Sequence, residues 1–407
     1  MNNIYDVAII GAGVAGSFAV DTLLKSDKKL SIAIIDIGRP PAKRRRQLEG
    51  WLGCLPSSDG KFYLSNLNKV SEIIGESDTN KSYEKVLSLV KKTCNVKFIK
   101  DDGPSRNIID KLEQNNYKII NNSYFQLIPQ DIHSISKQIS KDFYDLQDRV
   151  NLLFDYEVKE IFCQNKIYNI IMDRLEVKAK KILFSVGRSG WRFAHEVFKK
   201  LGLIENNDYA KYGIRIETPT DNLLEFNKSP CSIVKDNIEI GPFQWNGTVI
   251  PEDHVDIATT SFRSNEARWK TDKVSFDFMI NSFIKDKGIE QKDRLAKLAF
   301  ILSNDRVLKE KLISLCTKKS KISVIPEYNE LIPFINDFAN TNISPGLILK
   351  SYFYSPTIST TSSKVNLDKN LQSNLDNFYI AGECSGISGL LAAAVMGTHA
   401  AISMLKE

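Results

Sequence analysis

The clearest structural pattern in this chain is YDVAIIGAGVAG, residues 5–16. Its first half is an apolar run rich in β-branched residues, which predicts a strand buried on both faces. Gly11, Gly13 and Gly16 follow in G-x-G-x-x-G spacing, and the residues after them have the apolar periodicity of a helix. Because strand, glycine turn and helix come in this order, the stretch predicts the first unit of a dinucleotide-binding domain.

Each of the three glycines has a distinct predicted task. Gly11 permits the tight turn, Gly13 lets the backbone approach a pyrophosphate, and Gly16 allows the helix to pack closely on the strand. The phosphate charge then lies at the positive end of the helix dipole. The predicted pyrophosphate loop therefore consists of Gly11, Ala12, Gly13, Val14, Ala15 and Gly16. The alternative is a strand, turn and helix that bind no ligand.

A second apolar run, LSIAIID at 30–36, predicts the neighbouring strand and ends on Asp36. Its carboxylate is expected to accept hydrogen bonds from an adenosine ribose and to repel a 2′-phosphate. A basic run follows at 43–46, and it predicts either neutralisation of cofactor phosphates or an exposed cluster of charges. The candidates that this region adds to the cofactor site are Ile37, Arg39, Arg44 and Arg45.

The segment FYIAGECSGISGLLAAAV, residues 378–395, predicts a late strand, a turn and a helix. In one large class of flavoproteins, unlike nicotinamide dehydrogenases, a late strand that ends in Ala-Gly-Asp or Ala-Gly-Glu returns to the same sheet, and this segment resembles that flavin-contacting element. Glu383 is then placed for the ribityl chain or, through water, for the pyrophosphate, and Gly382 is a further cofactor-binding candidate. Gly389 and Leu390 open a helix whose N–H groups would stabilise negative charge on a reduced flavin. The alternative is a helix of small residues that packs tightly on a sheet.

Two middle segments agree with this order. KKILFSVGRSG, at 180–190, resembles the strand and turn that carry the chain over the adenosine half of FAD, with Val186 and Gly187 at the turn. LFDYEVKEI, at 153–161, resembles the strand whose backbone near Val158 meets the adenine. The region around them has short alternating runs and turn residues, which predict a β-meander.

Together these motifs resemble the FAD-dependent dehydrogenase family, within the glutathione-reductase-type flavoproteins that have one dinucleotide fold. The resemblance is carried by DVAIIGAGVAG, IIDIGR, SDGKF, SVGRSGWRF, YGIRIETP and FYIAGECSGISGLLAAA. It implies FAD as the cofactor and places Ser58, Asp59 and Lys61 at the flavin. Members of the family have a glycine- and alanine-rich loop before Ser-Asp-Gly-Lys, whereas this chain has WLGCLPS. The substrate class is therefore not carried over.

Candidates for chemistry other than cofactor binding are few. Cys54, in the departing loop, is a candidate for a redox or covalent role, although an unpaired cysteine is more often inert. His254 is a candidate general acid or base, with a structural or surface histidine as the alternative. Arg263 and Arg268 are candidates to clamp a substrate carboxylate, with solvated charges as the alternative. No metal-ligand pattern and no Ser/His/Asp constellation competes.

Composition limits the remaining classes of protein. A chain of 407 residues with 42% hydrophobic and 26% charged residues is long enough for two or three domains with sizeable cores. The net charge of +6 is too mild to argue for nucleic acid, and none is expected as a partner. Six cysteines without a CxxC pair favour free thiols in the cytoplasm. The apolar run near the C-terminus is too short for a membrane span, so no membrane association is expected.

The predicted architecture is α/β with two domains. A Rossmann-like FAD-binding domain with a mostly parallel sheet is expected to be discontinuous, over 1–70, 151–205 and 362–407. An inserted substrate domain of mixed β-sheet and helices is expected over 71–150 and 206–361. Within it, YGIRIET predicts a strand, and apolar spacing predicts helices between 276 and 316, with stripes at Leu295, Leu298, Ala299 and Leu302 and at Leu308, Leu312 and Leu315.

The function predicted from the sequence is hydride transfer between a small-molecule carbon and flavin N5. Only one dinucleotide motif is present, so reduction is expected from the substrate itself, from a nicotinamide that docks transiently, or from a protein electron donor. Two alternatives stay open. One is a flavin-dependent monooxygenase, and the other is a binding protein that retains FAD as a structural or sensing element, with RNA as a candidate partner.

Overall fold

The structure is a computed structural model of the whole chain. It describes residues 4–40, 43–44, 47–145, 149–253, 258–263, 271–341, 343–344, 346–361 and 363–406. Within this description, the side chains of 142–145, 248, 253 and 258–263 are not included. No helix among the described residues is long and apolar enough to cross a membrane.

The chain divides into two compact units, each built from separate stretches. The first contains Met1–Lys97, Gln126–Asn207 and Thr360–Glu407, and the second contains Phe98–Phe125 and Asp208–Ser359. The predicted division differs in two places, because segments 71–97 and 126–150, assigned to the inserted domain, fall in the first unit. Helices α3 (Glu76–Thr93) and α5 (Pro129–Asp145) pack there against α12 (Leu390–Lys406) and α1 (Val14–Leu24) respectively.

A mostly parallel sheet forms the centre of the first unit, which confirms the predicted fold class. Its strand order is β7-β2-β1-β10-β9-β8, and β22 also pairs with β10. The strands are β1 (Ile4–Ile10), β2 (Ile32–Asp36), β7 (Val150–Phe154), β8 (Val158–Gln164), β9 (Ile167–Met172), β10 (Glu176–Phe184) and β22 (Phe378–Ile380). β1, β2, β7, β10 and β22 are parallel to their neighbours in this group, whereas β8 and β9 are antiparallel.

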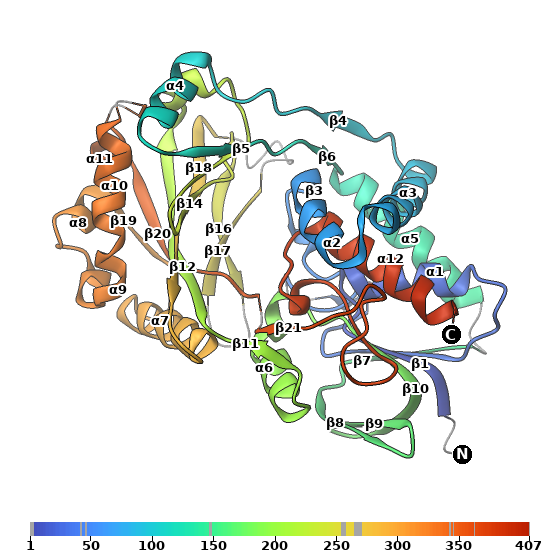
Figure 1. The fold of residues 1–407 in the computed structure, drawn as a ribbon. Coiled ribbons are helices and arrows are strands. Elements are labelled where there is room, and N and C mark those ends of the chain that lie inside the picture. Colours follow the sequence, from blue (N-terminus) through green and yellow to red (C-terminus); the bar gives the residue numbers. More distant parts are fainter. Residues whose placement is uncertain are drawn as a thin grey trace. The chain divides into compact units, whose positions relative to one another are not determined.

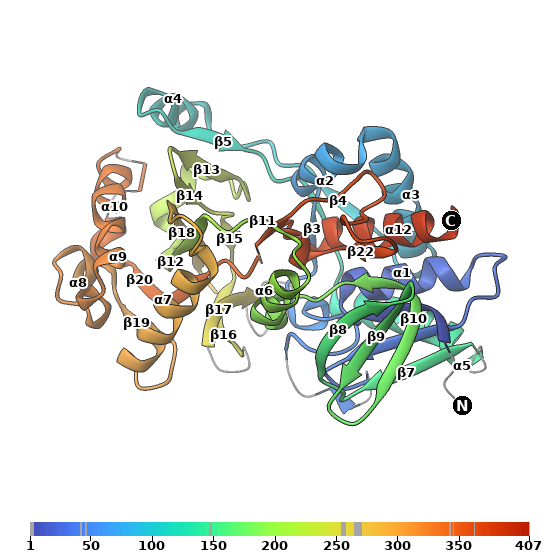
Figure 2. The same ribbon diagram turned by 60° about the horizontal axis from the view of Figure 1, so that its bottom comes forward.

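The pairing of β10 joins the meander to the parallel strands. Its first half pairs antiparallel with β9, and its second half pairs parallel with β22 along the same edge. Figure 2 shows β8, β9 and β10 side by side. Because β10 also pairs with β1, the late strand β22 lies two positions from the strand that leads into the glycine turn. The predicted return of the C-terminal segment to this sheet is confirmed.

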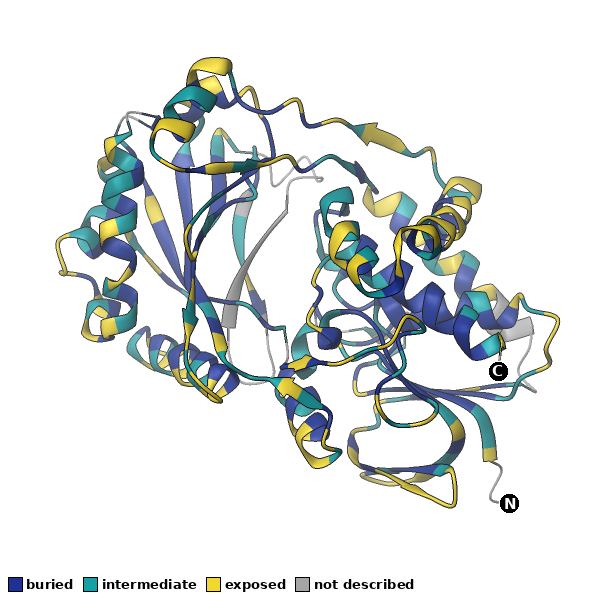
Figure 3. Ribbon diagram, viewed as in Figure 1, coloured by how far each residue is buried: buried dark blue, intermediate teal, exposed yellow. Residues whose placement is uncertain are grey.

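Apolar strands and small residues explain the packing of this unit. β2 is buried at every position, and Ile10, Phe184 and Ile380 are at most 3% exposed. Helix α12 is buried over most of its length (Figure 3). It packs so closely on α1 that a Cβ on Gly397 would lie 2.0 Å from the carbonyl oxygen of Ala15. Two helices can approach this closely only where a side chain is absent.

The remaining elements of the first unit are short. They are β3 (Lys61–Tyr63), α2 (Leu67–Ile74), α6 (Trp191–Lys200), and the strand pair β11 (Ile204–Asn206) and β21 (Lys364–Val365). The unit boundaries fall within β4 (Lys97–Ile99) and β6 (Tyr124–Gln126).

The second unit is an antiparallel sheet with helices on one face. The strand order is β19-β20-β12-β18-β14-β13-β5, and β15 also pairs with β18. The strands are β5 (Lys118–Ile120), β12 (Tyr209–Pro219), β13 (Ser232–Lys235), β14 (Ile238–Ile240), β15 (Gln244–Trp245), β18 (Lys273–Phe283), β19 (Leu308–Lys311) and β20 (Tyr352–Ile358). A separate hairpin consists of β16 (Thr248–Asp253) and β17 (Ala258–Arg263).

Helices cover the apolar face of this sheet (Figure 1). Ile214 and Ile216 of β12 and their partners Phe278 and Phe276 of β18 are fully buried, while alternate residues such as Arg215 and Asp277 point to the other face. The helices of this layer are α7 (Gly288–Leu302), α8 (Leu312–Cys316), α9 (Pro326–Asn329), α10 (Leu331–Asn340) and α11 (Leu347–Lys350), and α4 (Arg106–Gln114) contacts the edge strand β5.

The predicted run of helices between 276 and 316 is wrong in two places. Residues 276–283 belong to β18, and Leu308 lies in β19. The helical stripes at 295–302 and at Leu312 and Leu315 are confirmed as α7 and α8. The predicted strand YGIRIET is confirmed within β12.

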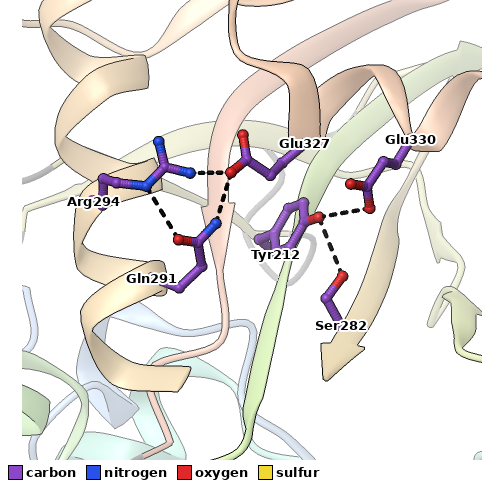
Figure 4. A network of polar contacts seen from close by, with 6 residues as sticks. All are labelled: Tyr212, Ser282, Gln291, Arg294, Glu327 and Glu330. Carbon is purple, nitrogen blue, oxygen red and sulfur yellow. Dashed lines mark hydrogen bonds and ion pairs between the residues drawn. The ribbon is translucent and has the colours of Figure 1, made fainter. Parts of the chain in front are cut away.

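A network of polar side chains ties the covering helices to one another and to the sheet (Figure 4). Glu327 of α9 accepts hydrogen bonds from two side chains of α7, one of them Gln291 at 2.8 Å. The Tyr212 hydroxyl of β12 donates to the Glu330 carboxylate at 3.1 Å. The residues of the network are Tyr212, Ser282, Gln291, Arg294, Glu327 and Glu330.

Candidate functional site

The glycine turn between β1 and α1 has the backbone that its sequence requires. Gly11 has φ of +99°, and a Cβ there would lie 2.6 Å from the carbonyl oxygen of Ser185. A Cβ on Gly16 would lie 2.1 Å from the carbonyl oxygen of Gly11. Both positions therefore exclude any other residue, and they make the tight turn and the close helix packing that the spacing predicts.

Gly13 differs from the other two glycines because open space lies beside it. The nearest atom to a Cβ at this position would be Cα of Gly53, at 4.0 Å. Gly13 is the residue before α1, which begins at Val14 and has no acidic residue in its first turn. The positive end of the helix dipole therefore faces a space that is bounded by bare backbone, an arrangement suited to an anion.

Two serines that the sequence analysis missed hold the turn in place. The Ser185 hydroxyl donates to the carbonyl oxygen of Gly11 at 2.8 Å, and the Ser17 hydroxyl donates to that of Ala12 at 2.9 Å. Both serines are buried. Ser185 immediately precedes the predicted turn residues Val186 and Gly187, so its place in the motif SVG was the available signal.

Asp36, at the end of β2, is buried and binds three backbone N–H groups. Its Oδ2 accepts from Ala12 at 2.7 Å, and its Oδ1 accepts from Gly38 at 2.7 Å and from Gly50 at 3.0 Å. Burial raises the pKa of this carboxyl group above its usual value, and the three N–H donors act in the opposite direction. Asp36 thus joins the glycine turn to two further loops.

The candidates for the adenosine half lie around Asp36. The Tyr156 N–H donates to the carbonyl oxygen of Asp36 at 3.2 Å, which brings the start of β8, at Val158, to the end of β2. Ile37 is 46% exposed beside the buried carboxylate. Arg39 lies next to Gly50, whose N–H binds Asp36, because a Cβ on Gly50 would be 2.4 Å from the Arg39 carbonyl oxygen.

The segment 58–61 is fixed by its own backbone and by a buried ion pair. The Ser58 hydroxyl accepts from the Gly60 N–H at 3.0 Å and donates to the carbonyl oxygen of Leu55 at 2.8 Å. Lys61 Nζ lies 3.3 Å from Asp59 Oδ2, and both residues are less than 9% exposed. These charges are therefore held in the interior of the unit.

The C-terminal element meets both the glycine turn and the segment that follows Lys61. A Cβ on Gly382 would lie 3.1 Å from Cβ of Ala15, at the first turn of α1. A Cβ on Gly389, which has φ of +117°, would lie 2.3 Å from Nδ2 of Asn66. Helix α12 begins at the next residue, Leu390, as predicted. Motifs that are more than 300 residues apart in sequence thus lie side by side.

Glu383 is partly exposed at this turn and contacts the hydroxyl of Thr360. That hydroxyl donates to Glu383 Oε1 at 3.2 Å, and Arg188 Nε donates to the same hydroxyl at 3.4 Å. Gly187 is exposed, with open space where a Cβ would lie. No feature of the sequence indicated the contact of Thr360 with Glu383.

Arg44 and Cys54 belong to the loop that precedes Ser58. The Arg44 guanidinium donates to main-chain carbonyl oxygens of this loop, for example to that of Trp51 at 2.6 Å. Cys54 is half-buried. The neighbouring candidate Arg45 lies outside the described residues.

Cys384, beside Glu383, is a buried thiol. It is 2% exposed, and burial raises its pKa to about 12. Its sulfur lies 3.5 Å from the carbonyl oxygens of Phe184 and Ala381. Cys384 therefore packs between β10 and the turn after β22.

The candidates for substrate chemistry are not assembled by the described structure. His254 and Arg268 lie outside the described residues, and Arg263 is described only as the last residue of β17, without its side chain. Among the residues that are described, no group of three or more His, Cys, Asp or Glu side chains is arranged to hold a metal ion.

Comparison with known proteins gives no family. No family model matches the chain, and no curated protein matches it. Solved structures that match include the halogenase PltM, 15% identical, over 99% of this chain and 70% of that one, with a TM-score of 0.45. Glycine oxidase from Geobacillus kaustophilus is 11% identical, over 99% and 95%, with a TM-score of 0.46. L-proline dehydrogenase from P. horikoshii is 12% identical, over 100% and 94%, with a TM-score of 0.46.

Proposed function

We propose that the chain is an FAD-dependent oxidoreductase that transfers a hydride between a carbon of a small-molecule substrate and N5 of the flavin. The observation that carries this proposal is that the turn between β22 and α12 packs against the glycine turn that opens α1. The backbone at Gly382 approaches Ala15, and α12 then begins at Leu390. The family resemblance assigns the glycine turn before α1 to the pyrophosphate of FAD and the start of α12 to its flavin.

The residues at the glycine turn fit a pyrophosphate. A Cβ on Gly13 would occupy the open space, so glycine is the residue that leaves room for another group. The N-terminal N–H groups of α1 supply a positive pole without an acidic side chain to neutralise it. Oδ2 of Asp36 accepts one backbone hydrogen bond, and a carboxylate oxygen can accept a second from a ribose hydroxyl.

The residues that would hold FAD fall into three groups along the molecule. When bound, FAD would accept or donate a hydride at its flavin ring. The pyrophosphate would lie at residues 11–16, with Arg39 nearby. The adenosine would lie at Asp36, Ile37 and Val158, with Val186 and Gly187 at the turn after β10. The flavin half would lie at Ser58, Asp59, Lys61, Gly382, Glu383, Gly389 and Leu390.

The chain's own charges favour an electron-rich ligand at the flavin half. Helix α12 has no acidic residue in its first turn, so its N-terminus is a positive pole. Lys61 is held by Asp59 in the interior, which fixes its position instead of leaving it to solvent. The Lys61–Asp59 pair is balanced in charge, so the N-terminus of α12 is the feature that would stabilise negative charge developing near it.

For substrate recognition we propose the residues that the sequence predicts. His254 is the candidate for proton transfer, and Arg263 and Arg268 are the candidates for a substrate carboxylate. Cys54, in the loop where this chain departs from the family, is expected to shape the pocket over the flavin before it takes part in chemistry.

Anaerobic reduction tests the proposal. The FAD-loaded protein is mixed without oxygen with NADH, with NADPH and with classes of hydroxy, amino and saturated acids, and the absorbance of the oxidised flavin is followed. We expect one of these classes to bleach the flavin while the hydride donor is converted into its oxidised product. A protein that takes up FAD but is bleached by none of them would instead be an FAD-retaining binding protein.

A further inference from the structure

The backbone at 50–53 has an unusual conformation. Gly50, Leu52 and Gly53 have φ of +87°, +61° and +53°. Leucine is disfavoured there because its Cβ crowds the backbone, and the Leu52 side chain is also fully buried. Such a conformation persists only where surrounding contacts fix it.

Two of these contacts attach the segment to the glycine turn and its strand. The Gly50 N–H donates to Asp36 Oδ1 at 3.0 Å, and the Leu52 N–H donates to the carbonyl oxygen of Ala12 at 2.9 Å. As a result Gly53 faces Gly13, and a Cβ on Gly53 would lie 3.1 Å from Cα of Gly13. The segment thus forms one wall of the open space beside Gly13.

Arg44 supplies the contacts on the other side. Its Nη1 donates to the carbonyl oxygen of Trp51 at 2.6 Å, and its Nη2 donates to those of Gln47 and Gly53. Three carbonyl oxygens are thereby gathered around one guanidinium group. The planar fork makes this geometry possible, because two nitrogens with fixed N–H directions reach separate acceptors. Burial lowers the pKa of Arg44, although charged groups nearby oppose the change.

We propose that Arg44 is a positioning residue that holds segment 47–53 against the glycine turn and so builds one wall of the pyrophosphate site. The proposal rests on the proposed function for FAD. It differs from the role predicted from the sequence, in which Arg44 neutralises phosphate charge. The two roles separate cleanly, since lysine preserves the charge at this position but has a single nitrogen and no fork.

The test compares Arg44→Lys and Arg44→Gln with the wild type and with a matched control. Arg149→Lys makes the same chemical change at another arginine of this unit, whose guanidinium also donates to loop carbonyl oxygens, those of Lys28 and Leu30. Hydrogen exchange is measured on the cofactor-free protein at the amides of Gly50, Leu52 and Gly53. FAD affinity is measured by quenching of flavin fluorescence at two salt concentrations.

If Arg44 positions the segment, both of its variants exchange the three amides at least about tenfold faster and bind FAD at least about tenfold more weakly. The amides of β1 keep their protection, and the control behaves as the wild type. The proposal is overturned if Arg44→Lys keeps wild-type exchange and affinity, or if protection is lost throughout β1 as well. A wild-type chain that takes up no FAD overturns the proposed function, while the exchange rates still decide whether Arg44 holds the segment.

Discussion

At the scale of single residues, the three glycines of the first turn are required for different physical reasons. Gly11 and Gly16 are required by the folded chain itself, because a Cβ at either would overlap a backbone oxygen. Gly13 is not required in this way, since a Cβ there would be 4.0 Å from its nearest neighbour. We propose that the absent side chain leaves room for the pyrophosphate. The contrast then separates a folding requirement from a proposed binding requirement at neighbouring positions.

The substitutions Gly13→Ala and Gly16→Ala test this separation. Gly16→Ala should lower the free energy of unfolding of the cofactor-free protein by about 3 kcal/mol, because the backbone must shift to admit the methyl group. Gly13→Ala should lower it by about 1 kcal/mol or less, as expected for alanine at a helix N-cap. It should nevertheless weaken FAD binding at least about tenfold.

Urea unfolding and FAD titration measure the two effects. Equal losses of stability in the two variants, or unchanged FAD affinity in Gly13→Ala, would contradict the assignment of Gly13 to the pyrophosphate.

Thiol labelling tests the environment of Cys384. Burial raises the pKa of this thiol to about 12, so the reactive thiolate is scarce at pH 8. An alkylating reagent should therefore modify the exposed Cys163 first and leave Cys384 unmodified until urea unfolds the chain. Mass spectrometry of peptides over a time course gives the rates. Labelling of Cys384 as fast as Cys163 in the folded protein would show that the turn after β22 is open.

At the scale of elements, the packing of α12 on α1 determines where the two halves of the site meet. Because Gly397 has no side chain, α12 can approach α1 until Gly397 packs directly against the backbone of Ala15. Ala15 also contacts Gly382, so a single residue of α1 sets the position of both the turn after β22 and the helix that follows. A change at the crossing should therefore alter both stability and cofactor binding.

Gly397→Ala is expected to lower the free energy of unfolding by about 3 kcal/mol, since its methyl group would lie 2.0 Å from a backbone oxygen. The matched control is Gly187→Ala, whose methyl group would enter open space at an ordinary φ of −93°. Its free energy of unfolding should stay within about 0.5 kcal/mol of the wild type. Urea unfolding of the cofactor-free proteins compares them. A tolerated Gly397→Ala would mean that the helices pack less closely than described.

Elements whose apolar pattern reflects local periodicity were predictable from the sequence. The βα unit at 5–24, the meander ending in β10 and the final strand, turn and helix all have such patterns. Residues 276–283 were predicted as helix but form a strand. Phe276, Phe278 and Ile280 alternate with Ser275 and Asp277, which is the pattern of a half-buried strand. The position of segment 47–53 was not predictable, since it depends on a left-handed leucine and on contacts to Arg44, Asp36 and Ala12.

At the scale of the whole molecule, one dinucleotide motif sits in a unit assembled from three stretches of the chain. Because β1, β10 and β22 are parallel strands of one sheet, the motifs that follow β1 and β22 both lie at the carboxyl ends of these strands. The second unit contains no second motif of this kind in its described residues. The account therefore predicts a single cofactor for each chain.

Titration of the purified, cofactor-stripped chain with FAD measures how many FAD molecules each chain binds. Absorbance of the protein fraction after gel filtration reports the bound flavin, and excess NAD⁺ serves as the competitor. We predict saturation at one FAD per chain and no displacement by NAD⁺. A chain that stays colourless at every FAD concentration, or that releases FAD to NAD⁺, would contradict the account.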